Sequence, residues 1–308
     1  MLETFQKTIL KKVLFKGIGL HSGLESEVKI LPADINHGIK FKRTDLNQNN
    51  LIEVDFKNVS SAQLCTTLTN NFNISVSTVE HLLAAIYITG IDNALIEINN
   101  SEVPIMDGSS KKFVETINEV GVIRLNAKRK YLKIVKKLEF NDNEKFISIE
   151  PNDEGLKVDF QLVYSNDVIG NQRNQVDFAN TDLTDVYTSR TFCLFEDIEK
   201  IKKIGLAKGG SLENAVVVKN KEILNTDGLR NKKEFVNHKI LDLAGDFVLS
   251  GYRVLGKVIC YQGGHELTHL FLRKLLKEKI AFLSTELKDN RIPEKTNSED
   301  SIRLTVNA

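Results

Sequence analysis

Histidines and carboxylates at helical spacing are the residues best able to do chemistry in this sequence. His238, Asp242 and Asp246 follow one another at four-residue intervals within residues 232–250. An imidazole and a carboxylate one turn apart can converge on one metal ion, and zinc accepts this pair of ligands. The alternative is a solvated helix face whose side chains touch only water. The segment predicts a helix with a core-facing stripe at three- and four-residue spacing, formed by Val236, Ile240, Leu243, Ala244 and Phe247.

A second candidate pair, Glu80 and His81, lies early in residues 77–89, which predict another helix ended by Gly90. Two simpler interpretations remain open for this pair. Ser77 and Glu80 fit a capping box, in which the glutamate reaches back to the backbone amide of the cap. A single histidine is usually an ordinary core or surface residue. We therefore expect Glu80 and His81 to have a chemical function only if residues from another part of the chain form a site with them.

The two predicted helices align with each other, which connects the candidate pairs. Residues 81–90 and 242–251 share an apolar helix pattern, a terminal glycine and a following strand, as expected of an internal duplication. The alignment sets His81 on Asp242, and equivalent positions near a pseudo-two-fold axis lie close together. His81, His238 and Asp242 would then form one site, whose fourth position stays open for water as in catalytic zinc sites. Glu80 would take a proton from that water.

His265 is a further candidate for acid–base chemistry. It follows Gly264 at the carboxyl end of a predicted strand, where a loop histidine is often exposed and functional. With Asp246 as its partner, His265 could stay protonated and serve as a general acid. The alternative is a turn histidine without a role. No H-E-x-x-H sequence occurs, which disfavours a metalloprotease of that type.

The composition limits the class of protein. The 308 residues carry 42 Lys+Arg and 41 Asp+Glu, so no global positive field attracts nucleic acid. Hydrophobic residues make up 41%, and no window reaches the roughly 18 apolar residues of a transmembrane segment. The N-terminus lacks the apolar core of a signal peptide, so we expect a cytoplasmic protein. Three cysteines without a C-x-x-C pair leave nitrogen and oxygen as the metal ligands.

Short strands and helices must position these side chains. A helix is predicted at residues 109–120, where Gly121 ends it. Residues 205–218 could line a passage for an apolar substrate, but the residues alone favour an edge hairpin. The order of elements repeats in the two halves, which agrees with the duplication. Turn residues bound the predicted strands, at residues 29–31, 39–43, 93–98, 131–135, 146–150, 156–163, 216–218 and 255–261.

A basic stretch, residues 126–130, is the predicted boundary between two domains, because a new strand follows it. A chain of this length holds about two domains. We therefore predict a first domain at 1–127 and a second at 128–288. The last residues, 289–308, are polar and contain Pro293 without a periodic apolar face, which predicts a flexible tail.

A series of short motifs runs through the chain in order. They are Gly17-Ile18-Gly19-Leu20-His21-Ser22-Gly23, Ser77-Thr78-Val79-Glu80-His81-Leu82, Gly90-Ile91-Asp92-Asn93, Pro104-Ile105-Met106-Asp107-Gly108-Ser109, Ser189-Arg190-Thr191-Phe192, Phe235-Val236-Asn237-His238-Lys239-Ile240-Leu241-Asp242 and Gly264-His265. Together they resemble the UDP-3-O-acyl-N-acetylglucosamine deacetylases, the zinc enzymes of the committed step of lipid A biosynthesis in Gram-negative bacteria. The resemblance runs from about Gln6 to Leu276 with little change in length.

The resemblance implies an α+β fold of two similar two-layer domains with the active site between them. Each domain would carry an insert. In the first it is a small sheet that includes the region of Cys65. In the second it is a βαβ unit near residues 191–218, which forms a hydrophobic passage for an acyl chain. This implied unit replaces the edge hairpin favoured above.

Residues at matching positions have implied roles in binding and catalysis. The ligands of Zn²⁺ would be His81, His238 and Asp242. The general base would be Glu80, and the general acid His265, oriented by Asp246. A hydrogen bond to the developing oxyanion would come from Thr191. Contacts with substrate would come from Phe192, Lys239, Leu20, Cys65, Ala207, Gly210 and Ser211.

The implied reaction is zinc-dependent hydrolysis of the N-acetyl group of UDP-3-O-(3-hydroxyacyl)-N-acetylglucosamine. The partner is then a small UDP-linked acylated amino sugar, and members of the family are generally monomers. The sequence departs from the pattern at Thr268 and His269, and His269 could be a further metal contact. Two alternatives remain: a zinc amidohydrolase acting on another acylated amino sugar, and a sugar-nucleotide binding protein without catalysis. The retained ligands, Glu80 and His265 disfavour the second.

Overall fold

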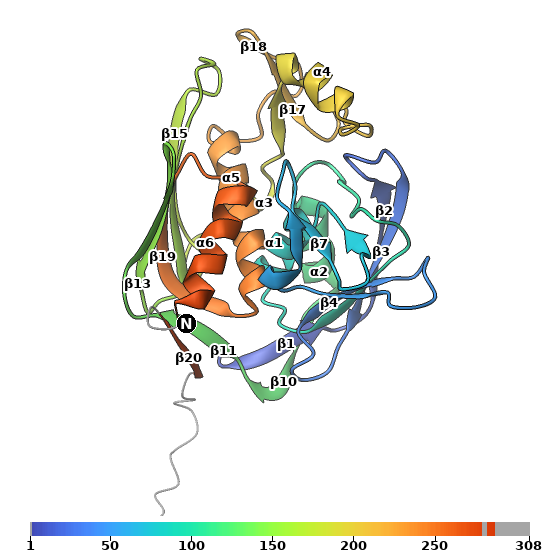
Figure 1. Cartoon of the computed structure of the whole chain (residues 1–308), viewed down its shortest axis with the longest axis vertical. Helices are drawn as coiled ribbons and strands as arrows, with labels where there is room; N and C mark the ends of the chain where they lie inside the picture. The colour runs from blue at the N-terminus through green and yellow to red at the C-terminus, as the bar shows by residue number, and fades with distance from the viewer. Residues whose placement is uncertain (1, 279–281, 287–308) are drawn as a thin grey trace, which may run out of the picture.

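The computed structural model describes residues 2–278 and 282–286. Within them the chain forms six α-helices and several β-sheets, and these sheets do not close into a barrel. Two sheet-and-helix halves face each other through their helices (Figure 1). The α+β class implied by the resemblance is therefore confirmed.

The first half is built on a five-stranded sheet in the order β2-β3-β9-β4-β5. In β3 buried and more exposed residues alternate, as expected of a strand with one face on the core. Helix α2 packs on this sheet, where the rings of Phe113 and Phe15 meet edge to face with centroids 4.8 Å apart. The elements are β2 (Val13–Ile18), β3 (Glu25–Pro32), β4 (Ile39–Arg43), β5 (Leu51–Glu53), β9 (Ala94–Ile98), α1 (Glu80–Ile88) and α2 (Lys111–Val120).

The second half is built on a seven-stranded sheet, and helices α5 and α6 lie against it (Figure 1). Helix α5 continues into a 3₁₀ turn, Val248–Ser250, that ends at left-handed Gly251 as predicted. Strand β20 was not predicted. The elements are β11 (Lys130–Ile134), β12 (Leu138–Asp142), β13 (Lys145–Pro151), β14 (Leu156–Val163), β15 (Asn171–Asp177), α3 (Thr184–Tyr187), α5 (Glu234–Phe247), β19 (Arg253–Tyr261), α6 (His265–Lys277) and β20 (Phe282–Glu286).

The two sheets share one strand order. The order β12-β13-β19-β14-β15 in the second half repeats β2-β3-β9-β4-β5 in the first. In each order the middle strand pairs parallel with the strand that follows it, β19 with β14 and β9 with β4. This order supports the predicted duplication, which stays a prediction, as does the domain boundary after residue 127. At that boundary β10 (Val122–Lys128) pairs with β1 (Phe5–Ile9).

Each half also carries a small additional sheet. In the first, β6 (Val59–Ser61), β7 (Thr67–Thr69) and β8 (Ser75–Val76) form a sheet, and Cys65 lies between its first two strands. In the second, β16 (Phe192–Leu194), α4 (Phe195–Lys203) and β17 (Val216–Lys219) form a βαβ unit, since β16 and β17 are parallel. Strand β18 (Glu222–Ile223) joins it antiparallel. The edge hairpin is therefore wrong and the implied βαβ insert is confirmed.

The capping box that remained open as an alternative for Ser77 and Glu80 does not form. Helix α1 begins at Glu80, and its cap residue makes no side-chain hydrogen bond. The Ser77 hydroxyl donates instead to the carbonyl of Ser101. The Glu80 carboxylate is buried and accepts a hydrogen bond from the backbone amide of Thr66.

Two predictions concern the membrane and the end of the chain. No helix among the described residues is long and apolar enough to cross a membrane. The polar tail predicted at residues 289–308 lies outside the described residues.

Candidate metal centre and active site

Helices α1 and α5 cross closely at Gly245. A Cβ atom at this position would lie 2.2 Å from the carbonyl oxygen of Glu80, so only glycine allows the approach. The contact brings the start of α1 against the polar face of α5. His238, Asp242 and Asp246 on that face are at most 4% exposed. The alternative of a solvated helix face is therefore excluded.

His81, His238 and Asp242 form a cluster of metal-ligand type. Both imidazole Nε2 atoms face Asp242 Oδ1, His81 at 3.5 Å and His238 at 3.4 Å. Ligand atoms around a tetrahedral zinc ion, with bonds of about 2.0–2.1 Å, lie about 3.3 Å apart. Asp242 Oδ1 is buried and accepts no hydrogen bond from the described residues. An unpartnered carboxylate oxygen facing two imidazole nitrogens fits a metal ligand.

Neighbouring groups keep His238 and Asp242 in the protonation states that metal ligands require. The carbonyl oxygen of Ser189, 3.1 Å from His238 Nδ1, orients the ring so that Nε2 faces Asp242. Burial lowers the pKa of His238 to about 3, so its ring is neutral at pH 7. Burial would raise the pKa of Asp242, but the Lys239 ammonium, 2.6 Å from Oδ2, holds it well below its usual range. The donors are thus a neutral imidazole and an ionised carboxylate.

Glu80 and His265 flank the cluster. His265 Nε2 lies 3.8 Å from both Glu80 Oε1 and Asp242 Oδ2, and its Nδ1 lies 2.7 Å from Asp246 Oδ2. Burial would lower the pKa of His265, but Asp246 and the neighbouring carboxylates raise it to about 10. Burial raises the pKa of Glu80. The acid–base candidates from the two halves therefore meet beside the metal cluster.

The prediction of His265 as an exposed loop residue is wrong. His265 is the first residue of α6 and is 8% exposed, because its ring packs on Asp246 and Glu80. Thr66 is a site residue that the sequence did not indicate. Its hydroxyl donates to Asp246 Oδ1 at 2.7 Å, and its side chain is buried. No spacing pattern could reveal this contact, because the two residues are 180 positions apart.

Thr191 and Phe192 lie at the start of the second insert, and Phe192 lies near His238 of the cluster. The backbone amide of Thr191 donates to the carbonyl of Gly108 at 2.7 Å, which fixes this segment on the first half. The Phe192 ring has its centroid 6.4 Å from that of His238, and Lys239 Nζ lies 6.0 Å from the Phe192 centroid. The predicted substrate contacts Phe192 and Lys239 therefore lie together at the metal cluster.

The other predicted contact residues lie in two places. Cys65 is buried one residue before Thr66, and burial raises the pKa of its thiol to about 12. Leu20 lies where a first-half loop meets the second insert, since its carbonyl accepts from the amide of Gly209 at 3.0 Å. His269 is not part of the metal cluster, and its Nε2 accepts from Arg273 Nε at 2.7 Å. The loop of Gly209 also contains Ala207, Gly210 and Ser211.

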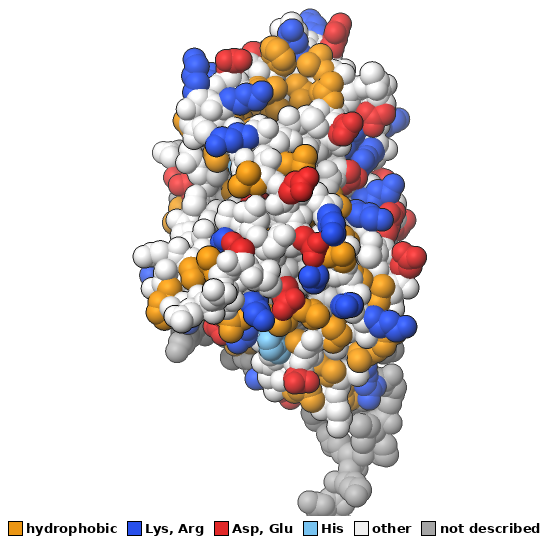
Figure 2. All heavy atoms as spheres, turned by 90° about the vertical axis from the view of Figure 1, so that its right-hand side faces the viewer, with side chains coloured by type: hydrophobic (Ala, Val, Ile, Leu, Met, Phe, Trp, Pro, Cys, Tyr) orange, Lys and Arg blue, Asp and Glu red, His pale blue; other side chains and the backbone are white. Residues whose placement is uncertain are grey.

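The second insert offers an apolar surface. Helix α4 has no buried residue, and apolar side chains gather at the insert end of the face in Figure 2, with lysine or arginine side chains around them. The exposed apolar residues of the insert are Phe195, Ile204 and Leu212. The unit that supplies Phe192 to the cluster therefore also presents apolar side chains to solvent.

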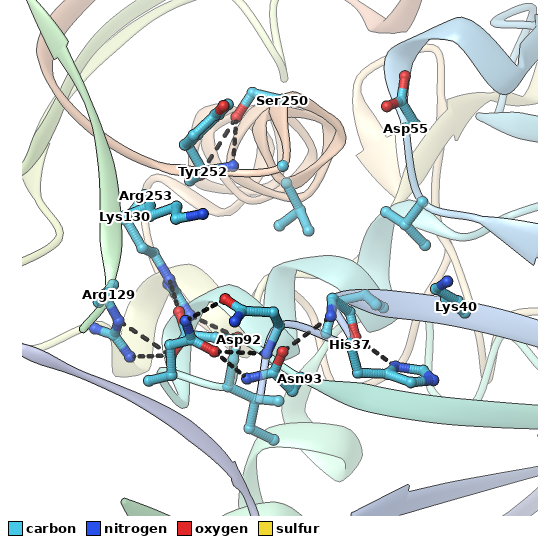
Figure 3. A pocket seen from close by; sticks show the side chains of 18 of the residues that line it. His37, Lys40, Asp55, Asp92, Asn93, Arg129, Lys130, Ser250, Tyr252 and Arg253 are labelled. Atoms are coloured by element: carbon cyan, nitrogen blue, oxygen red, sulfur yellow. Dashed lines mark hydrogen bonds and ion pairs between the residues drawn. The ribbon is translucent and has the colours of Figure 1, made fainter. Parts of the chain in front are cut away.

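A cavity of about 480 Å³ lies at the other end of α1, lined by Tyr87 and Ile91 (Figure 3). Its two arginines are partnered across the halves. Arg129 donates to Asp92 Oδ2 at 2.7 Å, and Arg253 donates to the carbonyls of Tyr87 and Ile91. A guanidinium complements the negative end of a helix dipole. The cavity therefore belongs to the joint between the halves and not to the metal cluster.

The fold and the site together define a class: α+β proteins with a buried His/His/Asp cluster able to hold a divalent metal beside acid–base groups. Similar sequences narrow this class. The sequence profile of the UDP-3-O-acyl N-acetylglycosamine deacetylase family matches residues 6–277. The chain belongs to the UDP-3-O-acyl N-acetylglycosamine deacetylase family, as the motifs indicated, and it is an enzyme of the deacetylase type.

Three relatives show how far the similarity extends. A UDP-3-O-acyl-N-acetylglucosamine deacetylase of Geotalea uraniireducens is 42% identical over 284 residues, 92% of each chain. The protein of that name from Campylobacter jejuni is 41% identical over 278 residues, 90% of this chain and 93% of its own. The one from Shewanella violacea is 40% identical over 281 residues, 90% of this chain and 92% of its own. The similarity thus spans both halves of the site.

Proposed function

We propose that the protein hydrolyses the N-acetyl group of UDP-3-O-(3-hydroxyacyl)-N-acetylglucosamine with a zinc ion, and so takes part in lipid A biosynthesis. The products are UDP-3-O-acyl-glucosamine and acetate. The observation that carries this proposal is the buried cluster of His81, His238 and Asp242 with Glu80 and His265 beside it. The proposed substrate is taken from the names of the relatives. A cytoplasmic monomer stays a prediction from the sequence.

His81, His238 and Asp242 would hold the zinc ion, because their donor atoms have the spacing that it needs. His238 and Asp242 also have the protonation states of metal ligands. When bound, the ion supplies Lewis acidity that polarises the acetyl carbonyl and acidifies water. Lys239 accompanies this set and neutralises the charge of Asp242 Oδ2. The oxygen Oδ1 is thereby left for the metal.

Glu80 acts as the general base of the proposed reaction. Its Oε2 is occupied by the amide of Thr66, so Oε1 is the oxygen that takes the proton of the attacking water. Burial raises the pKa of this carboxyl group, and a base with a raised pKa accepts a proton more readily. His265 then gives a proton from Nε2 to the departing amine, while Asp246 holds Nδ1. Base and acid are separate residues on opposite halves of the site.

Thr191 stabilises the oxyanion that develops on the acetyl carbonyl, through a hydrogen bond from its hydroxyl. Lys239, Phe192, Leu20 and Cys65 contact the substrate. The apolar second insert receives the acyl chain. Each buried CH₂ group contributes about 0.8 kcal/mol, so the shape of this passage sets the preferred chain length.

Metal analysis combined with an acetate-release assay tests the proposal. The purified chain is expected to hold about one zinc and to release acetate from the acylated UDP-sugar. Glu80→Ala is expected to keep the metal and to lower turnover about 10²–10⁴-fold, because it removes the proton acceptor. Glu115→Ala, at an exposed position of α2, is the matched control and should leave turnover unchanged.

Two outcomes would contradict the proposal. Full turnover in Glu80→Ala would exclude Glu80 as the base. A wild-type enzyme that releases acetate only from a different acylated amino sugar would replace the proposed substrate by the alternative amidohydrolase activity.

A further inference from the structure

Thr66 uses each of its polar groups within the site. It lies directly before β7 in the first insert and is 2% exposed. Its amide donates to Glu80 Oε2 at 3.0 Å, and its hydroxyl donates to Asp246 Oδ1 at 2.7 Å. Its carbonyl accepts from the amide of Val79 at 3.4 Å. One residue therefore contacts carboxylates from both halves of the molecule.

We infer that Thr66 is a positioning residue that holds the general base Glu80 and the Asp246–His265 pair in register across the two halves. The inference rests on the proposed function, because Glu80 and His265 are the base and acid of that reaction. Thr66 itself does not touch the reacting atoms. It acts by fixing which atoms of its neighbours point into the site.

The hydroxyl of Thr66, together with Asp246, keeps a proton on Nδ1 of His265. A threonine hydroxyl has one proton to donate, and here Asp246 Oδ1 receives it. Toward His265 Nδ1, 3.3 Å away, the same oxygen can act only as an acceptor. Asp246 Oδ2, 2.7 Å from that nitrogen, is likewise an acceptor. Both contacts require a proton on Nδ1, so Nε2 is the atom left to exchange a proton with substrate.

The amide of Thr66 acts on the base in the same way. It occupies Glu80 Oε2 and leaves Oε1 facing His265 Nε2 at 3.8 Å. Since Thr66 also accepts from Val79, the residue before Glu80, the start of α1 is held from two sides. The contacts of Thr66 thus orient both the oxygen of the base, Glu80 Oε1, and the nitrogen of the acid, His265 Nε2.

Two substitutions at position 66 distinguish the role of the hydroxyl from an effect on folding. Thr66→Val keeps the branched shape but removes the donor to Asp246, whereas Thr66→Ser keeps the donor. Loss of a partner that orients a reacting group typically costs 10- to 100-fold in activity. Thr66→Val is therefore expected to lower kcat about 10- to 100-fold, with KM within about twofold and zinc content unchanged.

The matched variants test the hydroxyl directly. Thr66→Ser is expected to recover kcat to within about threefold of wild type. Thr67→Val should leave kcat unchanged, because within the described part of the chain the Thr67 hydroxyl has a hydrogen bond only with Cys65 Sγ, at 3.9 Å. Wild-type turnover in Thr66→Val would overturn the inference, as would an equal loss in Thr66→Ser.

Nitrogen NMR of the wild-type enzyme with ¹⁵N-labelled histidine gives a second test that needs no altered threonine. The His265 signals, assigned by their loss in His265→Gln, are expected to show a protonated Nδ1. An unprotonated Nδ1 would overturn the inference even if Thr66→Val failed to fold. A wild-type enzyme without acetate release would refute the proposed function, whereas an unprotonated Nδ1 would contradict only the inference about Thr66.

Discussion

The two oxygens of Asp242 have different surroundings although they belong to one carboxylate. Oδ2 accepts from Lys239 at 2.6 Å, whereas Oδ1 faces the imidazoles of His81 and His238 without a hydrogen bond from the described residues. A buried acceptor without a partner costs about 1–3 kcal/mol. A bound cation removes this cost, which is the physical reason for assigning a metal to these three side chains.

His238→Ala is expected to lose the metal, since it removes one of three ligands. Zinc measured after dialysis should fall from about one ion per chain to below about a tenth. His269→Ala is the control, because His269 lies on α6 outside the cluster and should keep full occupancy. Retention of zinc by His238→Ala would contradict the ligand assignment.

At the scale of elements, the crossing of α1 and α5 decides whether a site exists. The ligands lie on two helices, and the backbones of these helices come into close contact where Gly245 meets Glu80. A larger residue there must push the helices apart, because the atom it would strike belongs to backbone. The distance between His81 and the ligands on α5 depends directly on this contact.

Gly245→Ala is expected to destabilise the fold by about 2 kcal/mol through overpacking and to weaken zinc binding in the same variant. Thermal unfolding and zinc titration measure the two effects. Asn118→Ala, at an exposed position of α2, should change neither. An unchanged Tm together with unchanged zinc affinity would contradict the role assigned to the contact between Gly245 and Glu80.

Most helices and strands near the site were predicted from the sequence. The local interpretations that failed there have a common cause. The helix stop at Gly251 and the strand at residues 156–163 agree with the structure. The capping box of Ser77 and Glu80 was wrong, and so was the exposed loop at His265. In both cases a local rule was overridden by a distant carboxylate contact, which a pattern of neighbouring residues does not contain.

At the scale of the whole molecule, the cluster joins the two halves. His81 comes from α1 in the first half, and His238 and Asp242 come from α5 in the second. At the other end of α1, Arg129 and Arg253 join the halves through Asp92 and backbone carbonyls. A metal bound at the cluster would therefore add a further link between halves that backbone and side-chain hydrogen bonds already join.

Removal of zinc by a chelator is expected to lower Tm by about 5 °C, and added zinc should restore it. An ion present at a hundred times its dissociation constant stabilises the folded state by about 2.7 kcal/mol, which corresponds to a shift of this size in a chain of a few hundred residues. His238→Ala should show no shift with the chelator. An equal shift in that variant would indicate a metal site elsewhere.

The sequence by itself determined the types of ligand, the pairing of His238 with Asp242 on one helix face, and the family through its ordered motifs. These features are local, because helix periodicity fixes which residues of one element share a face. Only the tertiary structure decided that His81 meets that face, that the face is buried, and that Thr66 contacts both Glu80 and Asp246. The packing of the two halves sets these contacts, and they cannot be inferred from the spacing of residues along the chain.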